Sequence, residues 1–163
     1  MASGDTLFDF GVQANEPPSS NAAALDVRNG RPVLAFDATA DESAIFCGTI
    51  PNHYAGGGIT ITIEWTGASA TSGNVVWNTA IERCDTGTDM DADSFATAQS
   101  ATAAAPGTSG APAYTTIAHT NGAQIDSALK NETIRLKLTR VGSSGSDTMT
   151  GDAHVTRVFA RET

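Results

Sequence analysis

Residues 59–65 read Ile-Thr-Ile-Thr-Ile-Glu-Trp, with an apolar side chain at every second position. Successive side chains of a β-strand point to opposite faces of its sheet, so this segment has one face for a core and one for water. Residues 134–141, which read Ile-Arg-Leu-Lys-Leu-Thr-Arg-Val, repeat the alternation. Both segments are therefore predicted to be strands that lie against a common core.

Similar short segments follow one another along the chain, separated by Gly, Asn, Asp, Ser and Pro residues. They lie at residues 6–12, 25–28, 32–36, 44–50, 59–66, 75–84, 95–98, 113–119, 132–141 and 153–160. Residues 99–113 are mostly Ala, Ser, Thr, Pro and Gly and are expected to form a long exposed loop. The pattern indicates an all-β fold, an antiparallel two-sheet β-sandwich or jelly roll of about 8–10 strands.

The N-terminal segment is expected to stand apart from this pattern. Residues 1–21 are predicted to be an arm or edge segment that ends in a proline-containing loop, and residues 22–163 a single jelly-roll domain. The arm carries three apolar side chains outside the strong sandwich pattern: Leu7, Phe8 and Phe10. These three are candidate interaction residues for a contact with a neighbouring subunit.

The charge of the chain excludes two classes of partner. Its formal net charge is −9, from 18 acidic and 9 basic residues. A phosphate backbone requires clustered Lys and Arg, and an anionic membrane surface attracts the same side chains, so neither partner is expected. The first residues contain neither a basic region nor an apolar run, so no signal peptide or membrane span is expected and synthesis in a cytoplasm is predicted.

One acidic loop is the candidate metal site. Asp89, Asp91 and Asp93 alternate as the oxygen ligands of a calcium loop do. Ser94 and Ser100 stand where an EF-hand loop requires Gly and Glu. A solvated acidic turn is therefore predicted, with calcium in a different loop geometry as the alternative, and no cofactor is expected.

The cysteines and histidines give no sharper signal. Cys47 and Cys84 lack CxxC spacing, and two thiols alone cannot form a four-ligand zinc site. Free buried thiols are predicted for them, with a disulfide as the alternative. His53, His119 and His154 are scattered without the spacing of metal ligands or acid–base groups.

Carboxylate chemistry is the remaining route to an enzyme. Glu64 and Glu82 are a candidate glycosidase pair if their strands are neighbours. With 18 acidic residues in the chain, some carboxylates must approach one another by chance. No nucleophile elbow of the GxSxG type is present, so no catalytic residues are predicted.

Aromatic side chains are candidates for a carbohydrate platform, since sugar rings stack on exposed aromatic faces. The candidates are Trp65, Trp77, Tyr54 and Tyr114. The two tryptophans are in phase with Ile and Val neighbours and are predicted to lie in the core. Tyr54, beside three consecutive glycines, is the predicted loop-tip aromatic.

Three stretches together resemble a known class of protein. They are residues 58–65, residues 74–83, and residues 134–141 with their continuation at 147–153. They are similar to jelly-roll structural proteins of tailed bacteriophages, which serve as capsid decoration (cement) proteins or as tail-associated modules. The resemblance covers roughly the last two-thirds of the chain. It implies an antiparallel jelly roll, a homotrimer and no enzymatic activity.

The expected function follows from that resemblance. It implies a decoration protein on the capsid surface of the virion, which binds the major capsid protein and stabilises the shell through the free energy of binding. The alternative is a tail-fibre, receptor-binding or carbohydrate-binding jelly-roll module that recognises surface glycans. An enzyme is the third interpretation.

Overall fold

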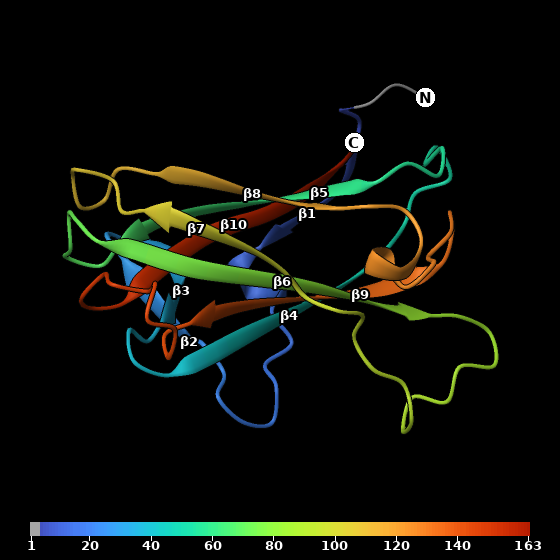
Figure 1. Ribbon diagram of the computed structural model, residues 1–163, viewed down its shortest axis with the longest axis horizontal. Helices are drawn as coiled ribbons and strands as arrows, with labels where there is room; N and C mark the ends of the chain where they lie inside the picture. The colour runs from blue at the N-terminus through green and yellow to red at the C-terminus, as the bar shows by residue number, and fades with distance from the viewer. Residues whose placement is uncertain (1–3) are drawn as a thin grey trace.

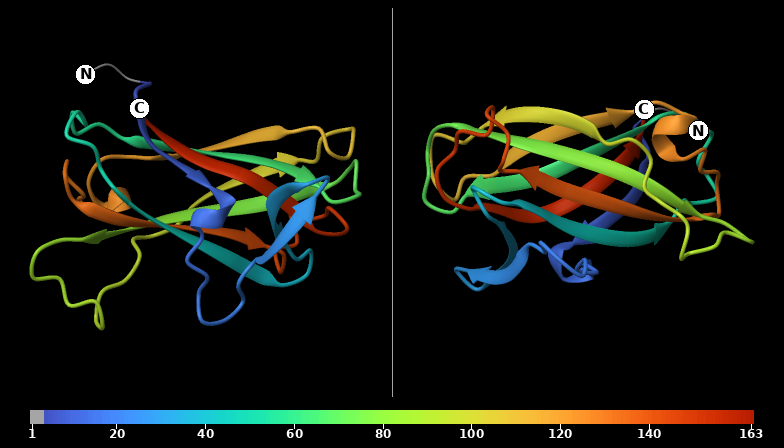
Figure 2. Two further views of the ribbon diagram at one scale, coloured as in Figure 1. Left: turned by 180° about the vertical axis from the view of Figure 1, so that it is seen from behind. Right: turned by 60° about the horizontal axis from the view of Figure 1, so that its bottom comes forward.

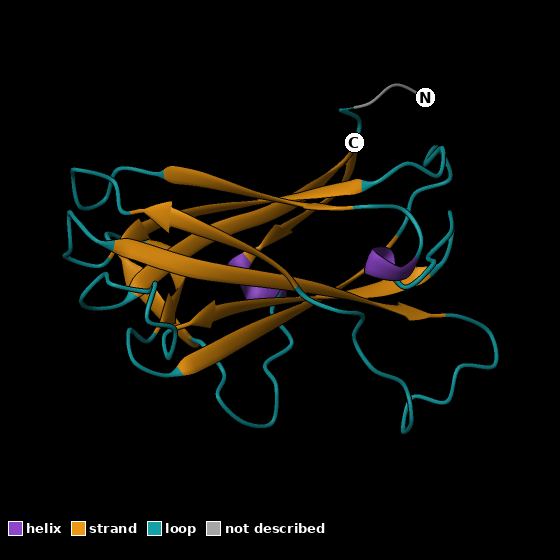
Figure 3. Ribbon diagram, viewed as in Figure 1, coloured by secondary structure: helices purple, strands orange, loops and turns teal. Residues whose placement is uncertain are grey.

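The computed structural model describes residues 4–163, which form ten strands and two short 3₁₀ helices (Figures 1 and 3). The strands are β1 (Thr6–Gly11), β2 (Ala24–Arg28), β3 (Arg31–Phe36), β4 (Asp41–Thr49), β5 (Ile59–Gly67), β6 (Asn74–Cys84), β7 (Gln99–Ala104), β8 (Ala113–His119), β9 (Thr133–Val141) and β10 (Ala153–Glu162). The helices are η1 (Val12–Ala14) and η2 (Ala123–Ile125). Among residues 4–163, no helix has the length and apolar character needed to cross a bilayer.

The strands form two layers, which confirms the predicted antiparallel β-sandwich (Figure 2). One sheet has six strands in the order β2-β3-β10-β5-β8, and β1 also pairs with β10. The other has four strands in the order β4-β9-β6-β7. All of these pairs are antiparallel.

The core lies between the two layers, where the alternating side chains of both sheets meet. Ile61 and Trp65 from the six-stranded sheet and Trp77 and Leu136 from the four-stranded sheet are all inaccessible to solvent. The two indole rings meet edge to face with centroids 5.7 Å apart. This is a favoured aromatic geometry, so the in-phase tryptophans are core residues, as predicted.

A buried ion pair closes one end of the sandwich. The side chains of Arg140 on β9 and of Asp147 are both fully buried, and Arg140 Nη2 lies 2.8 Å from Asp147 Oδ1. Arg140 also donates to the carbonyl groups of Phe36, Gly151 and Met149, over 3.1, 2.9 and 2.9 Å. The guanidinium therefore has the hydrogen bonds that a buried charge requires.

Of the two alternatives for the N-terminal segment, an arm or an edge segment, the structure fits the edge segment and corrects its role as a contact for a neighbouring subunit. Strand β1 pairs with β10, and Asp9 lies opposite Phe159. Its three apolar side chains are buried within the same chain: Leu7, Phe8 and Phe10. They fill the core and are not available to a neighbouring subunit. Residues 1–3 of the predicted arm lie outside the described residues.

A second correction concerns β7. Residues 99–104 form a strand at the edge of the four-stranded sheet, within the stretch predicted to be a loop. Its inward side chains, Ala101 and Ala103, pack against the core. Alanine has low β-propensity, so the strand depends on pairing with β6, which a local pattern does not reveal. The strand predicted at 95–98 is instead irregular.

Candidate functional site

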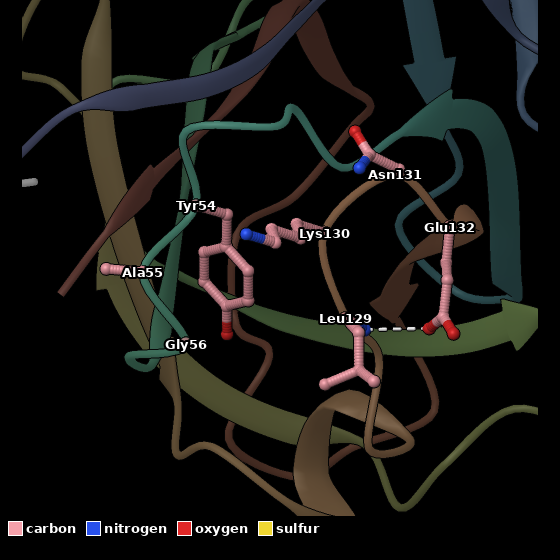
Figure 4. A pocket seen from close by; sticks show the side chains of 7 residues that line it. All are labelled: Tyr54, Ala55, Gly56, Leu129, Lys130, Asn131 and Glu132. Atoms are coloured by element: carbon pink, nitrogen blue, oxygen red, sulfur yellow. Dashed lines mark hydrogen bonds between the residues drawn. The ribbon is translucent and has the colours of Figure 1, made fainter.

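One hollow lies at an end of the sandwich, between two loops (Figure 4). We call it the loop-end hollow; its volume is about 480 Å³, and it is lined by Tyr54, Ala55, Gly56, Leu129, Lys130, Asn131 and Glu132. The exposed side chain of Leu129 lies at its rim, and the Glu132 carboxylate accepts a hydrogen bond of 2.7 Å from the Leu129 amide. The Glu132 carboxylate is thus engaged with the backbone of its own loop.

Tyr54 is a wall of this hollow and not an exposed platform. Its side chain is only 4% exposed, and its hydroxyl donates to the carbonyl of Gly57. Burial raises the pKa of its phenol, with a smaller contribution from the charge of Glu162. The structure therefore corrects the expectation that this ring stands at a loop tip.

The three glycines beside Tyr54 have a structural explanation. Glu162 of β10 accepts a hydrogen bond from the amide of Gly57 over 3.0 Å and from that of Ala55 over 3.1 Å. A Cβ on Gly58 would lie 2.7 Å from the carbonyl oxygen of His119, a distance that steric repulsion forbids. The loop is thus fixed against the sheet, and Gly58 permits the close approach.

A second candidate site crosses the outer face of the six-stranded sheet. Two hollows of about 340 and 350 Å³ share three lining residues, Arg31, Glu64 and Thr156, so they adjoin. We call the pair the sheet groove. One end is bounded by Gly110 and Pro112, and the other by the segment from Gly11 to Gln13 around η1.

A β-bulge in β10 builds the middle of the sheet groove. Val155 pairs with Trp65, but Arg157 pairs with Glu64, so Thr156 is the additional residue. Its hydroxyl donates to Glu64 Oε1 over 2.7 Å. Bulges redirect side chains, and this one places two consecutive polar side chains of β10 beside Glu64.

The neighbours of β10 also change at the bulge. On the edge of β10 away from β5, β3 pairs with residues 153–155 and β1 with residues 157–161. The two partner strands leave an opening between Gly11 and Arg31, and one of the two hollows lies there. The topology of the sheet therefore produces the hollow.

Tyr114 provides an aromatic ring next to the sheet groove. It lies on β8 directly opposite Glu64 and is 61% exposed. Hydrogen bonding to the Glu64 carboxylate, together with its negative charge, raises the pKa of the Tyr114 phenol. Five large apolar side chains are exposed among residues 4–163, and Tyr114 is the only aromatic one.

Tyr114 was among the aromatic candidates in the sequence, but Tyr54 was preferred as the exposed ring, although the strand pattern favoured Tyr114. Ile117 faces the core, so Thr115 and His119 share its side of the strand and Tyr114 must point outward. The aromatic residue beside glycines was preferred because loop tips are usually exposed, but Tyr54 is covered by its own loop. The alternation of inward and outward side chains along a strand therefore predicts exposure better here than a position beside glycines does.

The acidic loop does not assemble a cation site. Asp89 and Asp91 are exposed, and Asp89 Oδ1 accepts a hydrogen bond of 3.1 Å from the Asp91 amide. Asp93 instead lines a small polar hollow with Arg83 and Asp126. No group of three or more His, Cys, Asp or Glu side chains within residues 4–163 is placed to hold a metal ion.

The other titratable candidates are also separate. Glu64 belongs to the six-stranded sheet, whereas Glu82 belongs to the four-stranded sheet and pairs with Arg135 at 2.7 Å. The structure does not bring these carboxylates together as a glycosidase pair. Cys47 and Cys84 are free thiols, as predicted, but Cys47 is exposed and Cys84 is half-buried, contrary to the predicted burial.

Comparison with known proteins gives likeness in structure but not in sequence. No family model matches the chain, and no curated protein matches it. The CBM22-1 xylan-binding domain of Xyn10C from Paenibacillus barcinonensis superposes with a TM-score of 0.54 at 10% identity, covering 99% of this chain and 97% of that one. The C-terminal CBM6 of LamC, a marine laminarinase from Zobellia galactanivorans, gives 0.51 at 11% identity, covering 97% and 100%. At such identities the likeness shows a shared β-sandwich fold.

Proposed function

We propose that this chain is a non-catalytic carbohydrate-binding module that binds a polysaccharide along the outer face of its six-stranded sheet. The observation that carries the proposal is Tyr114, a largely exposed ring directly opposite Glu64 and beside the sheet groove. An aromatic face buries the apolar side of a sugar ring, while a few fixed polar groups select its hydroxyl groups. Glu64 and Thr156 are such groups because they are already ordered by their mutual hydrogen bond.

The two structural neighbours support this proposal. One is described as xylan-binding, and the other is a carbohydrate-binding module of a laminarinase. The loop-end hollow is the less suitable site, since the aromatic ring there is buried and its hydroxyl is bonded to Gly57.

The first prediction concerns Tyr114. Titration of the purified chain with xylan and laminarin oligosaccharides should give saturable binding, measured by calorimetry. Tyr114→Ala should weaken it about tenfold, because loss of a central aromatic contact costs over 1 kcal/mol and about 1.4 kcal/mol is a factor of ten.

The matched control is Leu129→Ala at the loop-end hollow, which also truncates an exposed apolar side chain. It should bind as the unaltered chain does, and circular dichroism should show that both variants are folded. Unchanged binding by Tyr114→Ala, or a loss confined to Leu129→Ala, would contradict the proposed site. Absence of binding to any polysaccharide would contradict the function.

The capsid decoration role, with a homotrimer bound to the major capsid protein, stays a prediction from resemblance. The stretches behind it include Ile61, Trp77 and Leu136, which are core residues. Any β-sandwich requires such core residues, so these stretches indicate the fold but do not identify the major capsid protein as a binding partner. Several hundred copies per purified virion would favour this role, and a few copies would favour a tail module.

A further inference from the structure

The outer face of the six-stranded sheet is rich in arginine although the chain is acidic. Four of its nine basic residues lie on β2, β3 and β10: Arg28, Arg31, Arg157 and Arg161. A concentration of guanidinium groups around the proposed binding site needs an explanation.

Three of these arginines have partners within the chain. Arg28 donates to the Gly67 carbonyl over 2.8 Å and to Ser109 Oγ over 2.9 Å. Arg157 forms a two-pronged ion pair with Asp9. The guanidinium carbon of Arg161 lies 5.4 Å from the ring centroid of Phe159, within the range of a cation–π contact.

Arg31 differs from the other three. Its side chain forms no hydrogen bond or ion pair with any residue in the described range 4–163, although it is one of the three residues that line both hollows. The nearby carboxylate, Glu64, accepts a hydrogen bond from the Thr156 hydroxyl over 2.7 Å. The sheet groove thus contains a guanidinium whose five donors are available to a ligand.

We propose that Arg31 binds the carboxylate of a uronic acid residue, so that the sheet groove selects acidic polysaccharides. This inference rests on the proposed function. Guanidinium and carboxylate are planar and form two parallel charge-assisted hydrogen bonds, which a neutral hydroxymethyl group cannot replace. The net charge of −9 would otherwise repel an acidic glycan, so the local arginines are needed to admit one.

The geometry requires an oligosaccharide. Arg31 lies on β3 and Tyr114 on β8, and β10 and β5 separate them in the sheet. Three inter-strand spacings amount to about 14 Å. The uronic acid at Arg31 and the sugar stacked on Tyr114 are therefore different residues of one glycan.

The test compares two ligands that differ only at one group of each sugar, which is a carboxylate in one ligand and a neutral hydroxymethyl group in the other. Oligogalacturonate and its carboxyl-reduced counterpart are titrated against the intact chain at low ionic strength. The acidic form should bind about tenfold more tightly, as expected for one hydrogen-bonded charge pair. Arg31→Gln should remove this preference and leave binding of the reduced form unchanged, and added salt should weaken only the acidic ligand.

Arg161→Gln is the control, because it removes a guanidinium from the same face that lines neither hollow. It should keep the preference. An equal affinity for both ligands, or a preference that survives Arg31→Gln, overturns the role of Arg31. So does equal Arg31-dependent binding of a sulfated glycan without carboxylates, since the recognised group would then not be a uronic acid.

The outcomes also separate this inference from the proposed function. Binding of the reduced ligand that depends on Tyr114 but shows no acidic preference overturns the inference alone. Failure of every glycan to bind overturns both.

Discussion

Two buried indole rings meet in the core, and they differ in the partners of their N–H groups. Trp65 Nε1 donates to Thr115 Oγ1 over 2.8 Å, whereas Trp77 Nε1 has no hydrogen-bond partner among residues 4–163. Trp65→Phe should therefore cost more stability than Trp77→Phe, by about 1–2 kcal/mol, because it leaves the buried Thr115 hydroxyl without its donor. Urea unfolding of the two variants measures the difference. Equal costs would show that the hydrogen bond contributes nothing net.

The burial of some aromatic residues can be predicted from the sequence, whereas that of others cannot. The burial of Trp65 and Trp77 was predictable because both are in phase with Ile and Val on their strands. The burial of Tyr54 was not, since it depends on Glu162, more than a hundred residues away, fixing the loop around it. Loop conformation is decided by such distant contacts.

At the scale of the element, β1 is part of the core. Phe10 stacks on Phe46 of β4 with ring centroids 5.4 Å apart, and a Cβ on Gly48 would lie 2.8 Å from Phe10 Cζ. Phe10→Ala should thus destabilise the fold by about 3–5 kcal/mol. Leu25→Ala, at an exposed position on β2, should change stability by less than about 0.5 kcal/mol. A small effect of Phe10→Ala in the same unfolding experiment would contradict the placement of β1 in the core and favour a separate N-terminal arm.

This result changes how an N-terminal deletion is interpreted. Removal of residues 1–12 would take away one of the three strands that pair with β10, together with Leu7, Phe8 and Phe10. A loss of capsid binding by that variant would therefore report unfolding as readily as a lost contact. The pattern at residues 6–12 predicts a strand but not its place in the sandwich, because the pattern is short and the partner strand lies at the other end of the chain.

At the scale of the whole molecule, His119 joins the two sheets. Its Nε2 lies 2.8 Å from Thr79 Oγ1 of β6, and its Nδ1 lies 3.1 Å from the carbonyl oxygen of Gln124. Burial lowers the pKa of His119 below its usual value of 6.5. The unfolded chain therefore takes up the proton first, and stability should be lost as the pH falls from 7.5 to 5.0.

Urea midpoints at these two pH values measure that loss. His119→Gln should reduce the change, leaving the part due to His154, whose pKa is also lowered by burial and by the charge of Arg28. His53→Gln, at an exposed loop position, should retain the full pH dependence. An unchanged slope in His119→Gln would mean that the buried imidazole is not the group that titrates.

The sequence by itself determined the two-faced strands and the side chains that line the core, because the period of two is a local property of each segment. It did not determine that β1 and β3 share one edge of β10, or that Thr156 forms a bulge beside Glu64. Alternation fixes the face of a side chain but not the partner of a strand, and pairing joins segments as distant as Asp9 and Phe159. The sheet groove, with Arg31 and Tyr114 on separate strands, exists only because of those pairings.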